Sequence, residues 1–408
     1  MHAGDGRPML EGVRIVDMTS VVFGPYATQI LADFGAEVIK IAAPGGDVYR
    51  YSARPAKTKG MAPGFHARNR RKKSGSLDLK EPDGAQTLQG LLSEADVFIH
   101  NVREAAIEKL GFGYDAVKAL APDIVYVHCV GFGSDGPYAG LQAYDDVIQA
   151  ASGATTLLPR VDGDGRPRCL PSLIADKVAG LHAAYATLAA IIHTLRTGRG
   201  QFVEVPMFES FASFMMKEHL DAKTFDPPNG DAGYGRQVAP DRQPLQTSDG
   251  WISIVPYLPQ HFPMVVGLLG DPKFADDERW QDARAVLAAG PELYAKTAAL
   301  AKKKSTEECL GILRGANIPA MPVTDLNDVV DDPHLRETGF FERIEHSTEG
   351  ALFQMREPSH FSDWSQGPIE DAPQLGEHDG EFKGGYAPVG PPLRPRDRDR
   401  QPASGLAL

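Results

Sequence analysis

The stretch Gly12–Ile41, GVRIVDMTSVVFGPYATQILADFGAEVIKI, contains the pattern that decides the fold class of this chain. The apolar segment Gly12–Asp17 predicts a buried strand, and Pro25–Phe34 predicts a helix that Gly35 closes. The apolar segment Glu37–Ile41 then predicts a second strand. A strand, a helix and another strand in this order form the unit from which parallel sheets are built.

The same alternation continues outward through the first half of the chain. Further short apolar strands are expected at 96–100, 123–129 and 201–205, with helices beginning near Pro82 and over 114–120. Short strands with intervening helices predict an α/β fold, in which a large Rossmann-like domain has a mostly parallel sheet covered by helices on both faces.

Changes in composition divide the chain into segments. The α/β pattern occupies 9–222, and the Pro-, Gly- and Asp-rich segment 223–248 is expected to be a linker or an active-site loop. Residues 249–330 predict a smaller α+β domain. The segment 331–382 is expected to return to the large domain, and the Pro/Arg/Asp-rich tail 383–408 is expected to be disordered.

The composition excludes several classes of protein. A chain of 408 residues with 42% hydrophobic and 24% charged residues is typical of a soluble globular protein, and its net charge of −12 argues against nucleic-acid binding. No run approaches the roughly 20 apolar residues that cross a bilayer, so no membrane contact is expected. Three widely spaced cysteines and scattered histidines predict neither a disulfide framework nor a metal site. Because no secretory signal opens the chain, a cytoplasmic location is expected.

The segment Leu170–Gly200 places Asp176 where an extended stretch turns into a long helix. Large apolar side chains in steps of three and four predict the core-facing stripe of this helix, namely Val178, Leu181, Tyr185, Leu188, Ile192 and Leu195. An aspartate at or beside a helix start commonly caps the unpaired N–H groups there. From this segment alone, capping is the simpler interpretation of Asp176, and a functional role is the alternative.

Two further motifs could bind phosphate groups. Gly131–Gly136 fits the pattern GxGxxG after a predicted strand, but Pro137–Gly140 follows and no helix opens there, so a nicotinamide site is not expected. A basic run suits a polyphosphate ligand, with a solvated loop as the alternative. Its members are Arg68, Arg70, Arg71, Lys72 and Lys73.

Taken together, these segments resemble the family III CoA-transferases, the CaiB/BaiF family that includes formyl-CoA transferase and carnitine CoA-transferase. The resemblance runs in the family's order to about Phe382, through LEGVRIVDMTSVVFGPYATQILADFGAEVIKI, NRRKKSGSLDLK, ADVFIHNVREAAIEKLGFGYDAV, PDIVYVHCVGFGSDGPYAG, AYDDVIQAASG, LIADKVAGLHAA and TGRGQFVEVPMFES. It implies an α/β domain plus a small domain, with two chains threaded through each other as interlocked rings.

The resemblance also implies the site residues. The aspartate of the motif matching LIADKVAG is the family's nucleophile, and Asp176 occupies that place. Residues expected near CoA are Lys72, Lys73, Asn101, Val102 and Lys109. Arg236 and Arg242 fall in the predicted active-site loop, where they either pair with the distal carboxylate of a dicarboxylic acyl group or face solvent.

The predicted function is the transfer of CoA between an acyl-CoA, such as succinyl-CoA, and a carboxylic acid by a homodimer without metal or prosthetic group. The intermediates would be an aspartyl–acyl anhydride and an aspartyl–CoA thioester. Backbone N–H groups of the Gly131–Gly136 loop are a hypothesis for the oxyanion site. The alternative is an α-methylacyl-CoA racemase or a CoA-dependent lyase. Tyr144 replaces the racemase histidine and is expected to lie near the substrate. Its reference pKa of about 10 disfavours proton exchange near neutral pH.

Overall fold

The computed structural model describes residues 7–52, 54 and 56–382, so the tail that was predicted to be disordered lies outside the described residues. The chain divides into two compact units, each described by itself. Unit 1 comprises Met1–Ala154, Cys169–Met215 and Arg336–Leu408, and unit 2 comprises Thr155–Arg168 and Met216–Leu335.

This division differs from the predicted domain bounds. Residues 155–168 and 216–222 belong to unit 2, although the large domain was expected to run from 9 to 222. The return to unit 1 begins at Arg336, a few residues after the expected 331.

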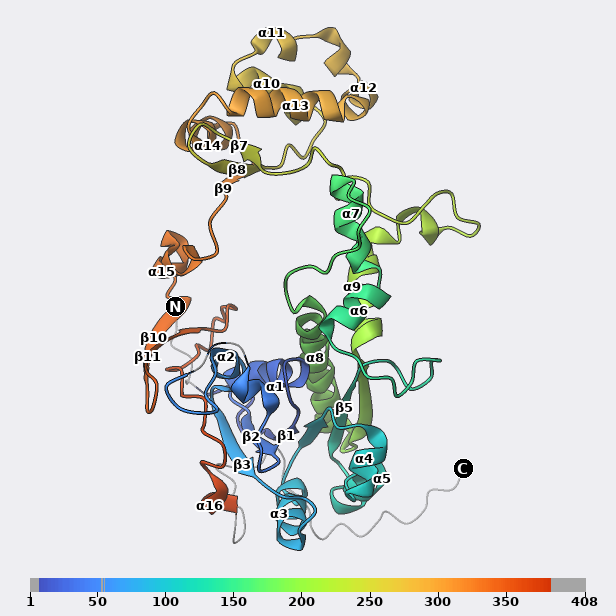
Figure 1. Cartoon of the computed structure of the whole chain (residues 1–408), viewed down its shortest axis with the longest axis vertical. Helices are drawn as coiled ribbons and strands as arrows, with labels where there is room; N and C mark the ends of the chain where they lie inside the picture. Colours follow the sequence, from blue (N-terminus) through green and yellow to red (C-terminus); the bar gives the residue numbers. More distant parts are fainter. Residues whose placement is uncertain (1–6, 53, 55, 383–408) are drawn as a thin grey trace. The chain divides into compact units, whose positions relative to one another are not determined.

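A six-stranded parallel sheet forms the centre of unit 1, with the strand order β3-β2-β1-β4-β5-β6 (Figure 1). Its strands are β1 (Arg14–Met18), β2 (Glu37–Ala42), β3 (Lys72–Ser76), β4 (Val97–His100), β5 (Val125–Val130) and β6 (Gln201–Pro206). This confirms the predicted Rossmann-like sheet. Strands β2 and β3 lie on one side of β1, and β4 to β6 lie on the other. The strand order therefore reverses between β1 and β4, whose carboxyl ends form a topological switch point.

Helices cover both faces of this sheet. Helices α1 (Phe23–Asp33) and α8 (Ile174–Thr197) pack against each other on one face. On the other face, α3 (Pro82–Ser93), α4 (Glu104–Lys109) and α5 (Tyr114–Leu120) bury a core with the strands. That core includes Val16, Ile39, Leu88, Leu91, Phe98, Ile107, Val117 and Tyr126.

Further helices and a hairpin complete unit 1. The helices are η1 (Val48–Tyr51), α2 (Pro63–Asn69), α6 (Asp145–Ala151), η2 (Ala154–Thr156), α9 (Met207–His219), α15 (Pro333–Glu337) and α16 (Asp379–Phe382), and of these η2, α9 and α15 cross a unit boundary. Strands β10 (Phe341–His346) and β11 (Gly350–Met355) form an antiparallel hairpin.

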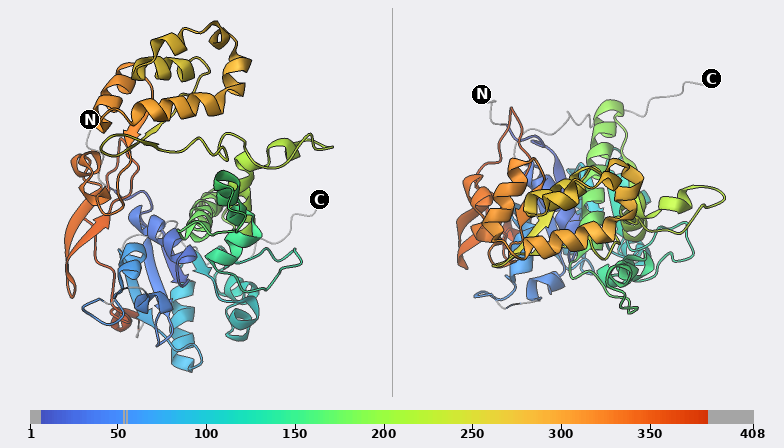
Figure 2. Two further views of the ribbon diagram at one scale, coloured as in Figure 1. Left: turned by 45° about the horizontal axis from the view of Figure 1, so that its top comes forward. Right: turned by 90° about the horizontal axis from the view of Figure 1, so that it is seen from above.

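Unit 2 is an α+β unit with its own apolar core. Its antiparallel strands are β7 (Leu245–Gln246), β8 (Trp251–Ile254) and β9 (Ala320–Pro322). Its helices are α7 (Leu157–Asp162), η3 (Asp221–Thr224), α10 (His261–Leu269), α11 (Pro272–Ala275), η4 (Glu278–Gln281), α12 (Ala283–Ala288), α13 (Gly290–Ala301), α14 (Thr306–Gly315) and η5 (Val329–Asp331). Figure 2 shows the yellow-to-orange helices α10 to α14 gathered into one group, which matches the packing of α10 on α11, α13 and α14.

The predicted core stripe of α8 is wrong for most of its members. Leu181, Tyr185, Ile192 and Leu195 are 48%, 54%, 53% and 44% exposed, although Val178 is buried. The buried face consists mainly of small residues, because α8 lies very close to α1. A Cβ on Gly180 would lie 2.9 Å from the carbonyl oxygen of Phe23.

Helix α8 is also long and apolar enough to cross a membrane by length and composition alone. Half of that apolar window is buried inside the chain. The core helix of a soluble protein has the same properties, so α8 is weak evidence for a membrane span.

Candidate active site

The backbone at the start of α8 fixes the position of Asp176. The helix begins at Ile174 after Leu173, whose side chain makes no capping hydrogen bond. Instead, the N–H of Asp176 donates to Oδ2 of Asp145, the first residue of α6, over 3.0 Å. Asp145 therefore satisfies an N–H group that a capping side chain would otherwise bind, and Asp176 is not the cap.

Gln149 holds the segment that leads into α8. Its Nε2 donates to Oδ1 of Asp145 at 2.5 Å and to the carbonyl oxygen of Ser172 at 3.1 Å. Its Oε1 accepts the N–H of Leu170 at 2.8 Å. Because Gln149 and Asp145 are both buried, the polar contacts that join α6 to the start of α8 are partly shielded from solvent.

The electrostatic environment of Asp176 opposes ionisation. Its side chain is buried, with a residue exposure of 6%. Burial and the nearby Asp145 carboxylate raise its pKa to about 7, while Arg68 and a hydrogen bond from the backbone of Phe23 lower it. A carboxyl group poised near neutrality in a buried position is characteristic of functional sites.

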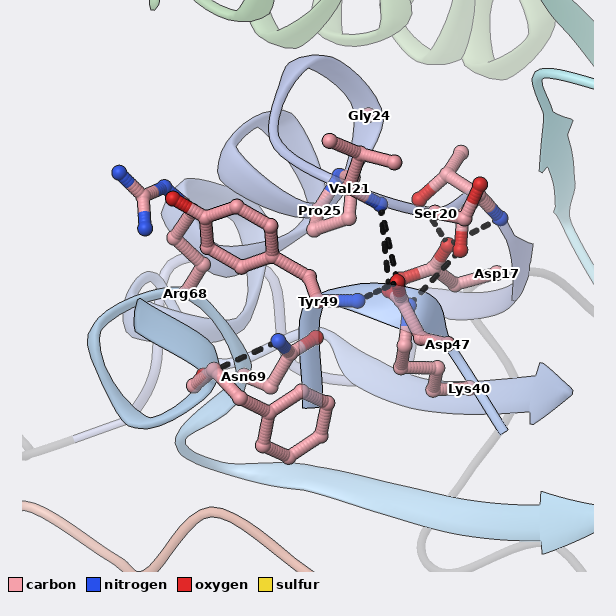
Figure 3. Close-up of polar contacts among 12 residues, drawn as sticks. Asp17, Ser20, Val21, Gly24, Pro25, Lys40, Asp47, Tyr49, Arg68 and Asn69 are labelled. Carbon is pink, nitrogen blue, oxygen red and sulfur yellow. Dashed lines mark hydrogen bonds and ion pairs between the residues drawn. The ribbon is translucent and has the colours of Figure 1, made fainter. Parts of the chain in front are cut away.

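The segment before α1 brings the Phe23 N–H group to this carboxyl. Val21 has a φ of 71°, in a region that a β-branched residue rarely adopts. Its N–H donates to both oxygens of Asp47 at 3.2 Å, and Asp47 also accepts the N–H of Tyr49 at 2.9 Å. Figure 3 shows these bonds converging on Asp47, which forms an ion pair with Lys40 at 3.4 Å. The strained turn is thus held by a buried, charged group.

Gly24 completes this turn. A Cβ at this position would lie 2.2 Å from Cγ2 of Thr19, so the start of α1 requires glycine. The close approach of Gly24 to Thr19 allows α1 to begin shortly after the end of β1.

Lys72, which the resemblance placed near CoA, lies in the interior of unit 1. Its side chain has no exposed surface and forms an ion pair with Oδ2 of Asp17 at 3.2 Å. Its Nζ also donates to the carbonyl oxygen of Pro25, to Thr28 Oγ1 and to Asn69 Oδ1. Burial lowers the pKa of Lys72, but the ion pair with Asp17 and the three oxygen acceptors make it a structural link between β3 and α1.

The other members of the basic run are also engaged. Arg70 forms a buried ion pair with Asp33, Arg71 pairs with Glu370, and Lys73 pairs with Glu37 at 3.3 Å and Glu381 at 2.8 Å. Arg68 donates to the carbonyl oxygen of Gly64 and lies 5.2 Å from the Tyr49 ring centre. The run is therefore a helix end followed by a strand, and Arg68 is its member that acts on Asp176.

A cavity of about 370 Å³ opens at the topological switch point. Asn101 and Val102, which follow β4, line this cavity together with Ser20, Asp47 and the exposed Lys80. The amide of Asn101 accepts the N–H of Ser20 and donates to its carbonyl oxygen, over 3.0 Å and 3.1 Å. The volume lies within the range of about 300–1,000 Å³ for small-molecule sites.

Two predicted residues lie apart from these groups in unit 1. Lys109 is exposed at the end of α4 and does not line the cavity, although Leu110 does. Tyr144 is 66% exposed and precedes the first residue of α6. Asp145 is the residue of this stretch that contacts Asp176. The pattern of an aspartate opening a short helix was the signal available for it.

The Gly131–Gly136 loop has carboxylate partners. The N–H of Gly133 donates to Glu209 Oε1 at 3.0 Å, and the N–H of Ser134 donates to Glu204 Oε1 at 2.9 Å. No helix opens between this loop and α6, as expected. The amides of Gly133 and Ser134 are thus occupied, whereas the backbone of Phe23 lowers the pKa of Asp176.

Arg236 and Arg242 belong to unit 2. They line a second cavity of about 250 Å³ in that unit. Within the described part of the chain, no group of three or more His, Cys, Asp or Glu residues could hold a metal ion.

The fold and the site define an α/β protein with a buried carboxyl group at the start of α8 and a cavity at the switch point of its parallel sheet. The model of CoA-transferase family III matches residues 10–379. The chain therefore belongs to CoA-transferase family III, as the resemblance indicated.

Similar proteins cover almost the whole chain. A probable fatty acyl-CoA transferase of Mycobacterium tuberculosis is 30% identical over 91% of this chain and 97% of its own length. A succinate–glutarate CoA-transferase of Agrobacterium fabrum is 28% identical over 91% of this chain and 94% of its own length. A formyl-CoA:oxalate CoA-transferase of Streptomyces avermitilis is 30% identical over 93% of this chain and 96% of its own length. The crystal structure of a CaiB/BaiF family protein from Brucella suis is similar with a TM-score of 0.79, 29% identity, and coverage of 92% and 98%.

Proposed function

We propose that this CoA-transferase works through Asp176 as a covalent nucleophile. The observation that supports this is a buried carboxyl group with a pKa of about 7, whose backbone Asp145 fixes at the start of α8. Asp176 also occupies the nucleophile position of the family motif. Arg68 is the cation that favours its ionised, nucleophilic form.

The proposed reaction has four steps. An oxygen of Asp176 attacks the thioester carbonyl carbon, the C–S bond breaks, and CoA thiolate leaves an aspartyl–acyl anhydride. The thiolate attacks the aspartyl carbonyl, which forms an aspartyl–CoA thioester and releases the first carboxylate. The second carboxylate attacks this thioester and regenerates the thiolate and an anhydride. The thiolate finally attacks the acyl carbon, which releases the product acyl-CoA and restores Asp176.

Each tetrahedral intermediate carries an oxyanion. The Phe23 N–H at the start of α1 already acts on the Asp176 carboxyl, and this supports it as a donor to the oxyanions formed on that carboxyl. Burial of Asp176 also keeps bulk water from the anhydrides.

The CoA portion is assigned to the cavity at the switch point. Asn101 and Val102 line it, and Lys80 is an exposed cation on its rim. Lys73 and Lys109 stay proposals for phosphate contacts, and for Lys73 this requires release from Glu37 or Glu381.

The donor is proposed to be an acyl-CoA such as succinyl-CoA, and the acceptor a carboxylic acid. Succinate–glutarate and formyl-CoA:oxalate CoA-transferases are similar along nearly the whole chain, which supports this substrate class. The racemase alternative needs a second proton carrier, whereas the charged side chains that act on Asp176 are Asp145 and Arg68.

A homodimer is proposed because α8 carries an exposed apolar face. Leu181, Tyr185, Ile192 and Leu195 lie outward on a helix whose other face is buried, and such faces mark association surfaces. The double variant Leu181→Glu/Ile192→Glu should lower the mass measured by light scattering from two chains to one. Leu120→Glu, at an exposed leucine on α5, is the matched control, and a single-chain mass for the wild type contradicts the dimer.

The function is tested with succinyl-CoA and a panel of carboxylic acids, with each CoA thioester identified by mass. Wild-type protein and the control Asp146→Ala should form new thioesters, and Asp176→Ala should not. Hydroxylamine should convert the intermediate into a hydroxamate at Asp176. Transfer that persists in Asp176→Ala overturns the nucleophile assignment.

A further inference from the structure

The second cavity, lined by the loop 235–242 and by helices α10, α12 and α13, combines apolar walls with two arginines. Its apolar side chains include Phe262, Val286, Leu287 and Pro291. Its volume of about 250 Å³ is slightly below the range of about 300–1,000 Å³ for ligand pockets. A cavity of this size suits a small ligand.

The two guanidinium groups at this cavity have no carboxylate partner within ion-pair distance among the described residues. Arg242 Nη1 donates to the carbonyl oxygen of Arg236 at 3.3 Å, and the Arg236 guanidinium carbon lies 5.7 Å from the Tyr257 ring centre. Neither contact neutralises a positive charge. Arg70 and Arg279, in contrast, each form ion pairs with carboxylates.

The charges of Arg236 and Arg242 both act on the phenol of Tyr294, which also lines the cavity. Burial raises the pKa of its phenol, and both Arg242 and Arg236 oppose this rise. Asp241 also lines the cavity, and it is exposed. The lining therefore contains two arginines and one aspartate, which gives it a formal excess of one positive charge.

We infer that this cavity of unit 2 binds a small organic carboxylate, with the carboxylate at Arg236 and Arg242 and a short apolar chain among Phe262, Val286 and Leu287. Guanidinium groups bind carboxylates in a bidentate manner, and the apolar walls favour a hydrocarbon chain. The inference deepens the proposed function, on which it rests for the role of this carboxylate as a transfer substrate. It predicts a preference for monocarboxylates with short chains.

Binding to the full-length protein without CoA tests the inference. Calorimetry should show that hexanoate binds at least about tenfold more tightly than hexan-1-ol, which lacks the charge, and more tightly than glutarate, whose second carboxylate would be desolvated among apolar walls. Arg236→Gln/Arg242→Gln should weaken hexanoate binding by about tenfold or more, and Ala239→Phe should weaken it by filling the cavity. Arg284→Gln, at an exposed arginine on α12 outside the lining, is the matched control.

Equal binding of hexanoate and hexan-1-ol, or unchanged hexanoate binding in the double variant with an unaltered melting temperature, overturns the inference. These measurements do not depend on Asp176. A failure of CoA exchange in the mass assay is therefore distinguishable from a failure of carboxylate binding in unit 2.

Discussion

Two buried carboxylates of unit 1, Asp17 and Asp176, lie in opposite electrostatic environments. Burial would raise the pKa of Asp17, but Lys72 and Lys40 lower it well below its usual range, with help from the hydroxyls of Thr19 and Thr28. Burial and the charge of another carboxylate, Asp145, raise the pKa of Asp176 to about 7. Both side chains are buried, so the opposite directions of their pKa shifts follow from the sign of the neighbouring charge.

The largest expected effect separates the two aspartates by activity. Asp176→Ala should lower CoA transfer by at least about 10³-fold, because the covalent route is lost. Its CoA affinity should stay close to that of the wild type. Steady-state rates and equilibrium CoA binding measure the two quantities. A loss of transfer activity of tenfold or less would contradict the covalent role of Asp176.

The second effect separates them by stability. Asp17→Asn leaves the Lys72 ammonium buried without a counter-charge and should lower the free energy of unfolding by about 3–5 kcal/mol, measured in urea. The double variant Asp17→Leu/Lys72→Met removes both charges and should recover part of the loss. If the double variant is as unstable as Asp17→Asn, the buried ion pair is not the cause.

Asp176→Asn, unlike Asp17→Asn, should raise the free energy of unfolding. The folded pKa of Asp176 is about 7 against an ordinary value of 3.8, so the folded protein retains a proton that the unfolded chain has lost. Wild-type stability therefore falls as pH rises from about 4 to 7, and Asp176→Asn avoids this loss, by about 2–4 kcal/mol at pH 8. Melting curves at pH 5 and pH 8 should show an advantage of Asp176→Asn that grows with pH.

A smaller effect concerns the pH dependence of turnover. With ionised Asp176 as nucleophile, kcat/KM should fall about tenfold per pH unit below about pH 7. Asp145→Asn removes the negative charge that raises this pKa, so the inflection should move to lower pH. An inflection that stays in place would show that Asp145 acts through the backbone alone.

The smallest effect is expected at Lys73. Its partly exposed ion pairs with Glu37 and Glu381 should contribute no more than about 1 kcal/mol, so Lys73→Ala should barely alter unfolding. A raised KM for acyl-CoA in Lys73→Ala would support its proposed phosphate contact. A large loss of stability would place it with Lys72 as a structural residue.

Much of the fold could be predicted from local pattern. The strands that begin at Arg14 and Glu37 and the helix between them follow from short-range signals, and so does the parallel sheet. The buried face of α8 could not be predicted in this way. Periodicity identified an apolar stripe through Leu181 and Ile192, but the close approach of α1 selected the opposite face of small residues.

The sequence by itself determined the α/β class and the family and selected Asp176 as the proposed nucleophile, because these depend on residue order and on a motif that is contiguous in the chain. Only the tertiary structure decided which charges face each other. Lys72 meets Asp17, 55 residues away, and Asp145 meets the backbone of Asp176, 31 residues away. Burial strengthens both interactions by lowering the local dielectric constant, and no local pattern records which partner the fold brings.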